Sequence, residues 1–312
     1  MRFVVIGPGA LGCLLAASLD ATGQQTVWLL DHDHHRAALL NRQGLRLTTP
    51  AGVRHCPVRA TDDGAAIGTV DCLLLCVKSH QVEAALTLAA PLLATAPLII
   101  GFQNGIGHLD TMAARLSPGK WGLGVTSSGA TLLAPGHVRP GGTGFTRIGF
   151  LHPPTPEAEA LLRKTAAALT ASGIDTTVAA DITTHIWSKL LVNAGINALT
   201  AILDCPNGGL LASPTARQRL TAAVLEGARI ASALGIPLRQ EPLATTLEVC
   251  RATSANLSSM LQDVRQERRT EIDAINGALV REGERLGIPV PENRALVREI
   301  KARERGFSDD SS

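Results

Sequence analysis

The glycine-rich stretch near the start of the chain constrains the fold more than any other feature. The β-branched run from Arg2 to Ile6 is typical of a buried strand, and Gly7-Pro8-Gly9-Ala10-Leu11-Gly12 follows it at once. An apolar segment from Leu11 to about Ala21 then predicts a helix. Between a strand and a helix, G-x-G-x-x-G predicts a dinucleotide site. The first glycine permits the tight turn, the second lets a pyrophosphate approach the backbone, and the third lets the helix pack against the strand.

An acidic residue lies where such a domain binds the adenosine ribose. Thr26 to Leu30 predicts the second strand, and Asp31 follows it, about 20 residues after Gly12 as in the dinucleotide fingerprint. A carboxylate there would bind the ribose hydroxyls and repel a 2′-phosphate, which favours NAD over NADP. The alternative is that Asp31 caps the next helix, a common use of Asp after a strand.

Polar side chains also follow two later strands. Asp71 to Val77 predicts a buried strand with Lys78 at its carboxyl end, and Pro97 to Gly101 predicts another that leads to Asn104 in a glycine-flanked turn. Ligands of open α/β sheets gather at those ends, so Lys78, Gln81 and Asn104 are candidate cofactor contacts. The alternatives are a solvated Lys at the head of a helix and a turn Asn that tolerates a left-handed backbone.

The pattern of elements changes near residue 180. Before it, strands and helices alternate, with a strand over 122–126, a β-meander or hairpins over 129–149, a helix over 157–172 and a last strand over 175–178, which predicts a doubly wound parallel sheet. After it, the predicted segments are all helical, near 182–203, 214–234, 241–253 and 258–286. We therefore expect an α/β Rossmann-type domain over 1–180 and an all-α domain over 181–312, with the active site in the cleft between them.

Three polar residues are aligned within an apolar stretch of the helical half. Lys189, Asn193 and Asn197 stand at i, i+4 and i+8 in HIWSKLLVNAGINALTAI, so a helix places them on one face. An amine and two carboxamides are costly to bury unless a partner occupies them. The alternatives are a surface stripe, or a Lys paired with a carboxylate and two Asn that make packing bonds.

Composition narrows the class of protein. The 312 residues suggest about two domains, and 29 basic residues nearly balance 27 acidic ones, so no charge block indicates nucleic acid. Absence of Tyr, with five Phe and three Trp, argues against base-stacking surfaces. The six Cys lack C-x-x-C spacing, so we expect reduced thiols and no metal site. We see no signal peptide and no apolar run of about 20 residues, which predicts a cytoplasmic protein.

Several longer motifs resemble those of the ketopantoate reductases (2-dehydropantoate 2-reductases) of pantothenate biosynthesis. They are Lys189-Leu-Leu-Val-Asn193 with Asn197, the run Cys205-Pro-Asn207-Gly, and Ser-Ser-Met-Leu-Gln-Asp over 258–263 followed by Thr-Glu-Ile-Asp-Ala-Ile-Asn-Gly over 270–277. The resemblance extends almost from end to end, from GPGALG at 7–12 to IPVPEN at 288–293. It implies reduction of ketopantoate to pantoate by a reduced nicotinamide.

The resemblance also implies roles for individual residues. Lys189 would be the general acid, and Glu271 would assist it near cofactor and substrate. The residues implied in substrate binding are Asn104, Asn193, Asn197, Asn207, Asn256 and Ser259, and those implied in cofactor binding beyond the glycine motif and Asp31 are Lys78, Asn104, Ala130 and Glu271. Without the resemblance, Glu271 would be assigned to a helix salt bridge with Arg268 or Arg269, and Ser259 to a helix cap.

The sequence departs from the family pattern at the cofactor. The family norm is NADPH, usually with an arginine after the second strand, whereas this chain has Asp31-His32 there and Arg36 further on. Lys78 is kept and could compensate. We expect NADPH from the resemblance, with NADH as the alternative that Asp31 favours.

Two other functions compete with this reading. One is a D-2-hydroxyacid dehydrogenase that acts on another branched 2-oxo acid, and the other is a nicotinamide-binding sensor without turnover. Intact Lys189, Glu271 and Ser259 argue against a sensor. We expect a small 2-oxo acid as the partner, neither nucleic acid nor a membrane, and an oligomeric state left open, a homodimer included.

Overall fold

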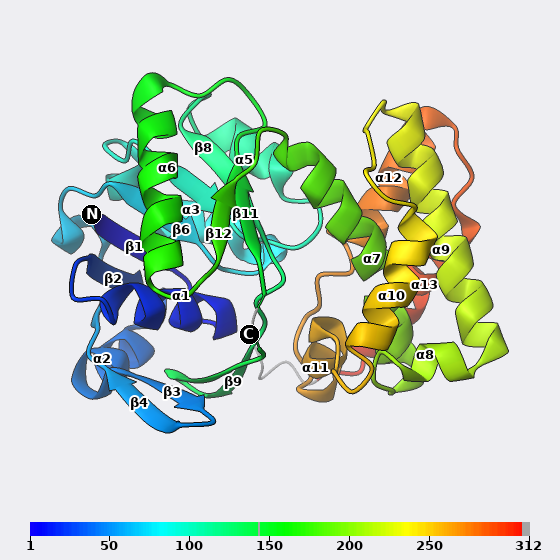
Figure 1. Ribbon diagram of the computed structural model, residues 1–312, viewed down its shortest axis with the longest axis horizontal. Helices are drawn as coiled ribbons and strands as arrows, with labels where there is room; N and C mark the ends of the chain where they lie inside the picture. The colour runs from blue at the N-terminus through cyan, green and yellow to red at the C-terminus, as the bar shows by residue number, and fades with distance from the viewer. Residues whose placement is uncertain (143, 308–312) are drawn as a thin grey trace. The chain divides into compact units, whose positions relative to one another are not determined.

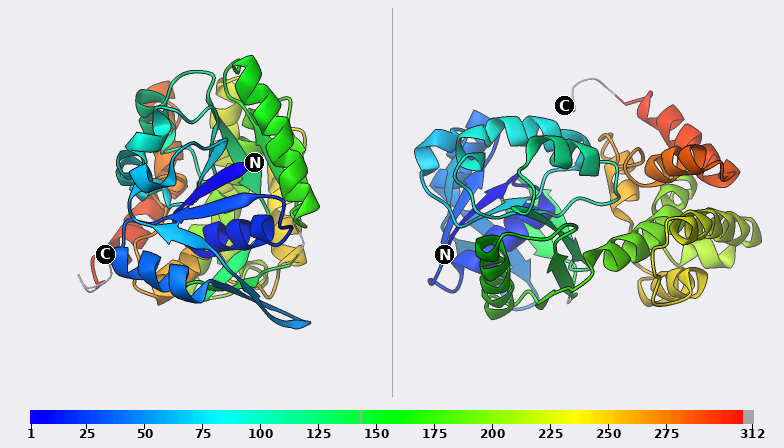
Figure 2. Two further views of the ribbon diagram at one scale, coloured as in Figure 1. Left: turned by 90° about the vertical axis from the view of Figure 1, so that its left-hand side faces the viewer. Right: turned by 90° about the horizontal axis from the view of Figure 1, so that it is seen from above.

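The computed structural model describes residues 1–142 and 144–307, which form two compact units (Figures 1 and 2). The first unit comprises Met1–Gln103 and Leu109–Ile182, and the second comprises Asn104–His108 and the chain from Thr183 onward. This division differs from the one expected from sequence in one respect. The short segment Asn104–His108 packs with the helical unit, although it lies far from it in the sequence.

The first unit is built on an eight-stranded sheet with the order β12-β11-β8-β7-β6-β1-β2-β5. Its neighbouring strands are parallel except β8 and β11, which are antiparallel. The predicted Rossmann-type sheet is therefore confirmed. Its strands are β1 (Arg2–Ile6), β2 (Thr26–Leu30), β5 (Arg59–Thr61), β6 (Cys72–Leu75), β7 (Ile99–Gly101), β8 (Trp121–Thr126), β11 (Thr146–Gly149) and β12 (Thr176–Val178).

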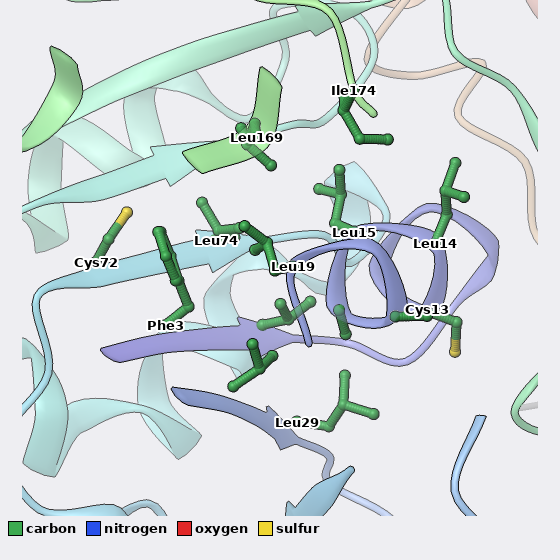
Figure 3. Packing of buried hydrophobic residues seen from close by; sticks show 14 of the residues in the cluster. Phe3, Cys13, Leu14, Leu15, Leu19, Leu29, Cys72, Leu74, Leu169 and Ile174 are labelled. Atoms are coloured by element: carbon green, nitrogen blue, oxygen red, sulfur yellow. The ribbon is translucent and has the colours of Figure 1, made fainter. Parts of the chain in front are cut away.

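Helices cover both faces of this sheet. Figures 1 and 2 show α1 (Ala10–Asp20) and α6 (Pro156–Ala171) on one face, and α3 (Val82–Leu88), α4 (Ala90–Leu93) and α5 (Leu109–Arg115) on the other. Phe3 of β1, Leu15 and Leu19 of α1, and Leu169 of α6 are buried together (Figure 3). A central strand covered on both faces explains why β1 is an unbroken apolar run.

A second, smaller sheet belongs to the same unit. Its order is β4-β3-β10-β9, formed by β3 (Leu45–Thr49), β4 (Gly52–Cys56), β9 (Ala130–Ala134) and β10 (His137–Pro140). The predicted hairpin over 129–149 is present as the antiparallel pair β9–β10, whereas the hairpin β3–β4 was not predicted. Helix α2 (His34–Gln43) connects β2 to this second sheet.

The second unit is helical, as predicted. Its helices are α7 (Ile182–Leu203), α8 (Gly209–Ala212), α9 (Pro214–Ala233), α10 (Pro242–Ala252), α11 (Ser259–Arg265), α12 (Asn276–Leu286) and α13 (Pro291–Glu304). The prediction of one helix over 258–286 was wrong, because the chain leaves the helix after Arg265 and re-enters it at Asn276. Glu267 has a φ of 51° within this break, and a left-handed residue ends an α-helix. Helix α13 was not predicted.

Helix α7 is long and apolar enough to cross a membrane by length and composition alone. The expectation that no apolar run reaches this length was therefore wrong. Within its most apolar window, 67% of the helix is buried inside the protein, as in the core helix of a soluble protein.

Candidate functional site

Helix α7 presents the three aligned polar residues predicted from sequence. Lys189, Asn193 and Asn197 fall on one face of a continuous helix; Asn197 is buried, and the other two are partly buried. The helix packs closely on α9, because a Cβ on Gly195 would lie 2.6 Å from Cγ2 of Val224. A glycine at this position lets the two helices approach and fixes the polar face in place.

Glu271 lies in the irregular segment between α11 and α12, residues 266–275. Its buried carboxylate accepts a hydrogen bond of 2.8 Å from Nδ2 of Asn104. It also lies near enough to Lys189 to act on its charge. The fold thus brings three predicted site residues together from positions far apart in the sequence.

The two arginines of the alternative assignment of Glu271, Arg268 and Arg269, each pair with an aspartate. Arg268 pairs with Asp263 at 3.2 Å, and Arg269 pairs with Asp273 at 3.6 Å. Both arginines therefore have other acidic partners. Glu271 instead takes part in the contact with Asn104.

The loop that carries Asn104 is bonded to the same irregular segment. The N–H groups of Ile106 and Gly107 donate to the carbonyl of Ala274, at 3.0 and 3.3 Å. Gly105 has a φ of 78°, and a Cβ on it would lie 2.0 Å from that carbonyl oxygen. The left-handed turn position is thus Gly105 rather than Asn104, and its lack of a side chain allows the close approach.

Burial and a neighbouring carboxylate act in opposite directions on Lys189. Burial lowers the pKa of Lys189 and Glu271 raises it by a smaller amount, and together they leave it at about 8, below its ordinary value. The sequence left the balance open, and in the structure burial dominates. The amine remains mostly protonated at neutral pH and is a stronger acid than an exposed Lys.

Ser258, rather than Ser259, caps helix α11. The Ser258 hydroxyl oxygen accepts from the N–H of Leu261 at 3.1 Å, and it is bonded to the Thr200 hydroxyl of α7 at 2.7 Å. Ser259 is the first residue of the helix, and its side chain is exposed. The cap role is therefore filled by its neighbour.

Asn207 and Asn256 lie side by side. The N–H of Asn207 donates to the carbonyl of Asn256 at 3.0 Å. The side chain of Asn207 is buried, and its Nδ2 donates to Oγ1 of Thr253 at 2.9 Å, whereas Asn256 is exposed. A backbone hydrogen bond thus connects the turn after α7 with the turn before α11. The side-chain amide of Asn207 is held by its hydrogen bond to Thr253.

The three motif glycines of the first unit meet different surroundings. Gly7 has a φ of 94°, and a Cβ on it would lie 2.6 Å from Cγ1 of Val77. A Cβ on Gly12 would lie 2.1 Å from the carbonyl oxygen of Gly7. Gly9 is exposed, and a Cβ there would meet no described atom within 4 Å. Gly9 is also the N-cap of α1, whose first turn receives no side-chain cap from the described residues. Exposed N–H groups beside an open glycine suit a pyrophosphate.

Asp31 is buried and forms an ion pair with the partly exposed Arg36 that sequence reasoning missed. Its oxygens accept from Nε and Nη2 of Arg36 at 2.5 and 2.6 Å, a bidentate arrangement. The cap of α2 is Asp33, which accepts from the N–H of Arg36 at 3.0 Å. The alternative that Asp31 caps the helix is therefore wrong. The negative charge of Asp31, on which the argument against NADP rests, is compensated.

The remaining cofactor candidates also belong to the first unit. Lys78 follows β6 and precedes a short 3₁₀ helix, Ser79–Gln81, and its N–H donates to Oε1 of Gln81 at 3.3 Å. Ala130 opens β9, where it pairs with Pro140 of β10. Lys78 is partly buried, Gln81 is exposed and Ala130 is partly buried.

Comparison with known proteins identifies the family. The ketopantoate reductase PanE/ApbA model matches residues 3–153, and the model of its C-terminal part matches residues 181–304. The chain belongs to the ketopantoate reductase family. This family consists of nicotinamide-dependent oxidoreductases.

Individual relatives are similar to this chain over nearly the full length of both proteins. The 2-dehydropantoate 2-reductase of Halobacterium salinarum is 34% identical over 98% of this chain and 99% of its own. The crystal structure of a PanE/ApbA family ketopantoate reductase from Ralstonia eutropha superposes with a TM-score of 0.88 at 29% identity, covering 98% and 99% of the two chains. A D-mandelate dehydrogenase structure with NADH and anilino(oxo)acetate gives 0.89 at 26% identity, again over 98% and 99%.

In this ketopantoate reductase family member, sequence reasoning missed the partners that hold the site residues. Arg36 is five residues from Asp31, outside the i+3 and i+4 spacing that suggests a helix pair. Thr270 and Glu304 are 34 residues apart, so their contact has no local pattern. The turn at Gly105 did carry a signal, its glycines, but nothing in the sequence identified the carbonyl it approaches.

Proposed function

We propose that the protein is a 2-dehydropantoate 2-reductase, which transfers a hydride from NAD(P)H to C2 of ketopantoate and yields pantoate. The observation that carries the proposal is the buried amine of Lys189, with its lowered pKa, beside a carboxylate held by Asn104. Membership of the ketopantoate reductase family supports the choice of substrate.

Lys189 would be the general acid of this reaction. A hydride that reaches the ketone carbon leaves negative charge on its oxygen, and a nearby ammonium stabilises that charge and then donates a proton to it. A pKa of about 8 suits this task, since the amine is protonated at neutral pH yet releases its proton more readily than an exposed Lys. Glu271 would keep the amine charged and oriented between turnovers.

Neutral groups near Lys189 would hold the substrate. Asn193 and Asn197 share the face of α7 with the amine, and Asn104 is bonded to Glu271. Ser259, with its exposed hydroxyl, would bind the substrate carboxylate, and Asn256 and Asn207 would complete the set. Asn and Ser fix an anionic substrate without a second positive charge that would compete with Lys189 for it.

The glycine motif would hold the cofactor, which supplies the hydride when it is bound. The open side of Gly9 and the first N–H groups of α1 suit the pyrophosphate. Lys78, Ala130, Asn104 and Glu271 would make the further contacts that the family pattern implies.

We propose NADPH as the preferred cofactor, with NADH accepted. Arg36 compensates the charge of Asp31 through two hydrogen bonds, so the repulsion of a 2′-phosphate is weaker than the sequence suggested. The Arg36 side chain is 32% exposed, so the ion pair is not closed off from solvent. Comparison of KM for NADPH and NADH tests the preference, and a lower KM for NADH would overturn it.

The proposal is tested by initial rates of NAD(P)H oxidation with ketopantoate. We expect turnover, and Lys189→Ala should lower kcat on the order of a hundredfold or more, as loss of a general acid does. Absence of turnover with both cofactors would overturn the proposed reaction. An unchanged kcat in Lys189→Ala would overturn the role of Lys189.

The second candidate is a D-2-hydroxyacid dehydrogenase for another 2-oxo acid. It is favoured by the close likeness to D-mandelate dehydrogenase, whose structure contains NADH. A panel of ketopantoate, 2-oxoisovalerate, 2-oxoisocaproate and an aromatic 2-oxo acid separates the two. A higher kcat/KM for any of the last three would favour this candidate.

A further inference from the structure

The irregular segment 266–275, which carries Glu271, is hydrogen-bonded to the C-terminal end of helix α13. The N–H and the hydroxyl of Thr270 both donate to Oε1 of Glu304, at 2.8 and 2.7 Å. Thr270 is 1% exposed, and Glu304 is partly buried. A carboxylate that accepts two hydrogen bonds from one residue restrains both the backbone and the side chain of that residue.

A second contact with α13, an ion pair, is made by Asp273 on the C-terminal side of Glu271. Nζ of Lys301 donates to Oδ2 of Asp273 at 2.5 Å and to Oε2 of Glu304 at 2.9 Å. Both oxygens of Glu304 are thus used, one for Thr270 and one for Lys301. Glu271 stands between the two fastened positions, Thr270 and Asp273.

Other charged groups reach this region through Asp273. Arg269 pairs with its carboxylate at 3.6 Å, and Arg281 of α12 donates to its carbonyl at 3.2 Å. Neither arginine is part of the contact between Thr270 and Glu304. Lys301 is therefore the cation that links Asp273 to Glu304.

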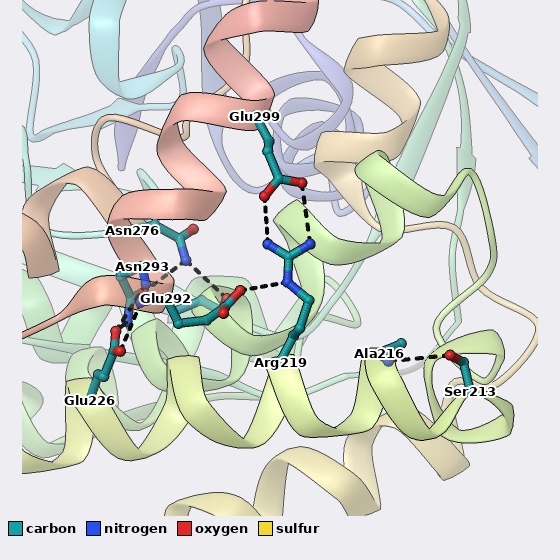
Figure 4. Close-up of polar contacts among 9 residues, drawn as sticks. Ser213, Ala216, Arg219, Glu226, Asn276, Glu292, Asn293 and Glu299 are labelled. Atoms are coloured by element: carbon teal, nitrogen blue, oxygen red, sulfur yellow. Dashed lines mark hydrogen bonds and ion pairs between the residues drawn. The ribbon is translucent and has the colours of Figure 1, made fainter.

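The opposite end of α13 is itself held in the core of the helical unit. The buried carboxylate of Glu226 on α9 accepts from the N–H groups of Glu292 and Asn293, at 2.8 and 2.9 Å (Figure 4). Nδ2 of Asn276 donates to Oδ1 of Asn293 and to the carbonyl of Ala194 on α7, both at 3.0 Å. A chain of bonds therefore connects α13 with the helix that carries Lys189.

A bidentate ion pair fixes the middle of α13. Arg219 of α9 binds Glu299 through Nη2 at 2.7 Å and Nη1 at 3.2 Å, and binds Glu292 through Nε at 2.7 Å (Figure 4). Planar arginine–carboxylate pairs of this kind restrict orientation as well as distance. Helix α13 is thereby held against α9 along its length.

We propose that Glu304 and Lys301 are positioning residues for Glu271, and that they set its placement beside Asn104 and Lys189. The inference rests on the proposed function, in which Glu271 acts on the general acid. A carboxylate in a helix is placed by the backbone ladder, but Glu271 lies where that ladder is interrupted. Its carbonyl accepts turn bonds from the N–H groups of Ala274 and Ile275, and the contacts of Thr270 and Asp273 fix the chain on either side of it. A displacement of about 1 Å at such a group can cost on the order of a hundredfold in rate.

The test compares Glu304→Ala and Glu304→Gln with the matched control Glu284→Ala. Gln keeps an oxygen that accepts from Thr270, whereas Ala removes it. Glu284 of α12 pairs with Arg294 of α13 at 2.8 Å on the exposed surface, so its removal breaks an interhelical ion pair distant in sequence from Thr270. Each variant is measured for kcat, KM, the pH dependence of kcat and the midpoint of thermal unfolding.

We expect Glu304→Ala to lower kcat by roughly ten- to a hundredfold, with a smaller change in KM for ketopantoate. The alkaline decline of kcat should also begin at lower pH in this variant than in the wild type. A displaced Glu271 would no longer raise the pKa of Lys189, so the amine would lose its proton earlier. Glu304→Gln should retain kcat within about threefold, since it restores the bond to Thr270. Glu284→Ala should match the wild type.

A wild-type pH profile and kcat in Glu304→Ala would overturn the proposal, even if its unfolding midpoint falls, since that result indicates a purely structural role. A pH dependence of kcat in Glu304→Gln that is no closer to the wild type than that of Glu304→Ala would do the same, because Gln keeps the acceptor for Thr270 and loses only the acceptor for Lys301. If Glu304→Ala does not fold, the decision falls to Glu304→Gln and to Thr270→Val. The latter keeps the side-chain shape and removes the hydroxyl's bond to Glu304, together with the bond that the hydroxyl accepts from the N–H of Ile272. A wild-type protein that does not reduce ketopantoate overturns the proposed function instead, which separates the two failures.

Discussion

Replacement of Glu271 by Gln should move the alkaline decline of kcat to lower pH. In the proposed reaction Lys189 acts as an acid only while it is protonated, so kcat should fall as the pH rises through its pKa of about 8. Glu271 raises that pKa, and Gln removes the charge while it keeps the shape and an oxygen that accepts from Asn104. The lysine of the variant should therefore lose its proton at lower pH.

The size of the shift follows from the burial of the pair. An opposite charge within about 4–6 Å changes a pKa by about one to three units. At the lower end of that range, the protonated fraction of Lys189 falls about fivefold at pH 8 but hardly at all at pH 6. Loss of direct contacts between Glu271 and ligand would lower kcat equally at every pH. The shape of the profile, rather than its height, is the diagnostic measurement.

The assay is kcat at saturating ketopantoate and cofactor, measured from acid to alkaline pH around the Lys189 pKa. Glu284→Gln, an exposed glutamate of α12 paired with Arg294, serves as the control and should keep the wild-type profile. A decline of kcat at unchanged pH in Glu271→Gln would refute the coupling to Lys189. A decline at higher pH would show that Glu271 lowers the pKa of Lys189 instead of raising it.

The other predictions concern stability and cofactor binding. Between pH 8 and 10.5 the free energy of unfolding of the wild type should rise relative to that of Lys189→Met, by up to about 3 kcal/mol. In that range the unfolded chain holds the Lys189 proton and the folded chain does not; parallel pH dependence in denaturant titrations would contradict this. Gly9→Ala should keep the thermal midpoint and raise KM for the cofactor at least about tenfold, whereas Gly12→Ala should lower the midpoint, because only the second Cβ meets the Gly7 carbonyl. Equal loss of stability in both variants would show that the fold needs Gly9 as well. Asp31→Asn should increase the preference for NADPH over NADH on the order of tenfold, because the charge beside Arg36 is lost; an unchanged ratio of kcat/KM values would remove this site from cofactor selection.

Local patterns predicted the elements that carry their own signal. The strand before Gly7 and the helix that contains Lys189 have the predicted bounds. The strand is a short, mostly apolar run that ends at a glycine, and the helix is a mostly apolar stretch whose polar residues recur at helical spacing. The alignment of Lys189, Asn193 and Asn197 needed only the helical repeat. The hairpin over 45–56 and helix α13 were missed although signals existed, a Pro-Ala-Gly turn for the first and Pro291 at the helix start for the second.

The break in the predicted helix over 258–286 has a different cause. Its residues are ordinary helix formers, and no Pro or Gly marks the end at Arg265. The chain leaves the helix where Thr270 and Asp273 bond to α13, so tertiary contacts override propensity there. Asn104 and Glu271 are 167 residues apart, and only the resemblance to ketopantoate reductases brought them into one predicted site.

The burial of Lys189 and the position of Glu271 in a non-helical segment together set the pKa of the Lys189 amine. A buried amine loses charge, and a carboxylate placed near it restores part of that charge, so the position of Glu271 sets how acidic the amine is. A helix would fix the direction of Glu271 by its own repeat, whereas the break lets the fold direct it at Asn104 and Lys189 together. Glu271 keeps this direction only if the non-helical segment 266–275 is restrained. The bonds of Thr270 and Asp273 to α13 restrain it. If Lys189 is the general acid, as proposed, the charged end of α13 would serve the acid–base chemistry of the site as well as the stability of the helical unit.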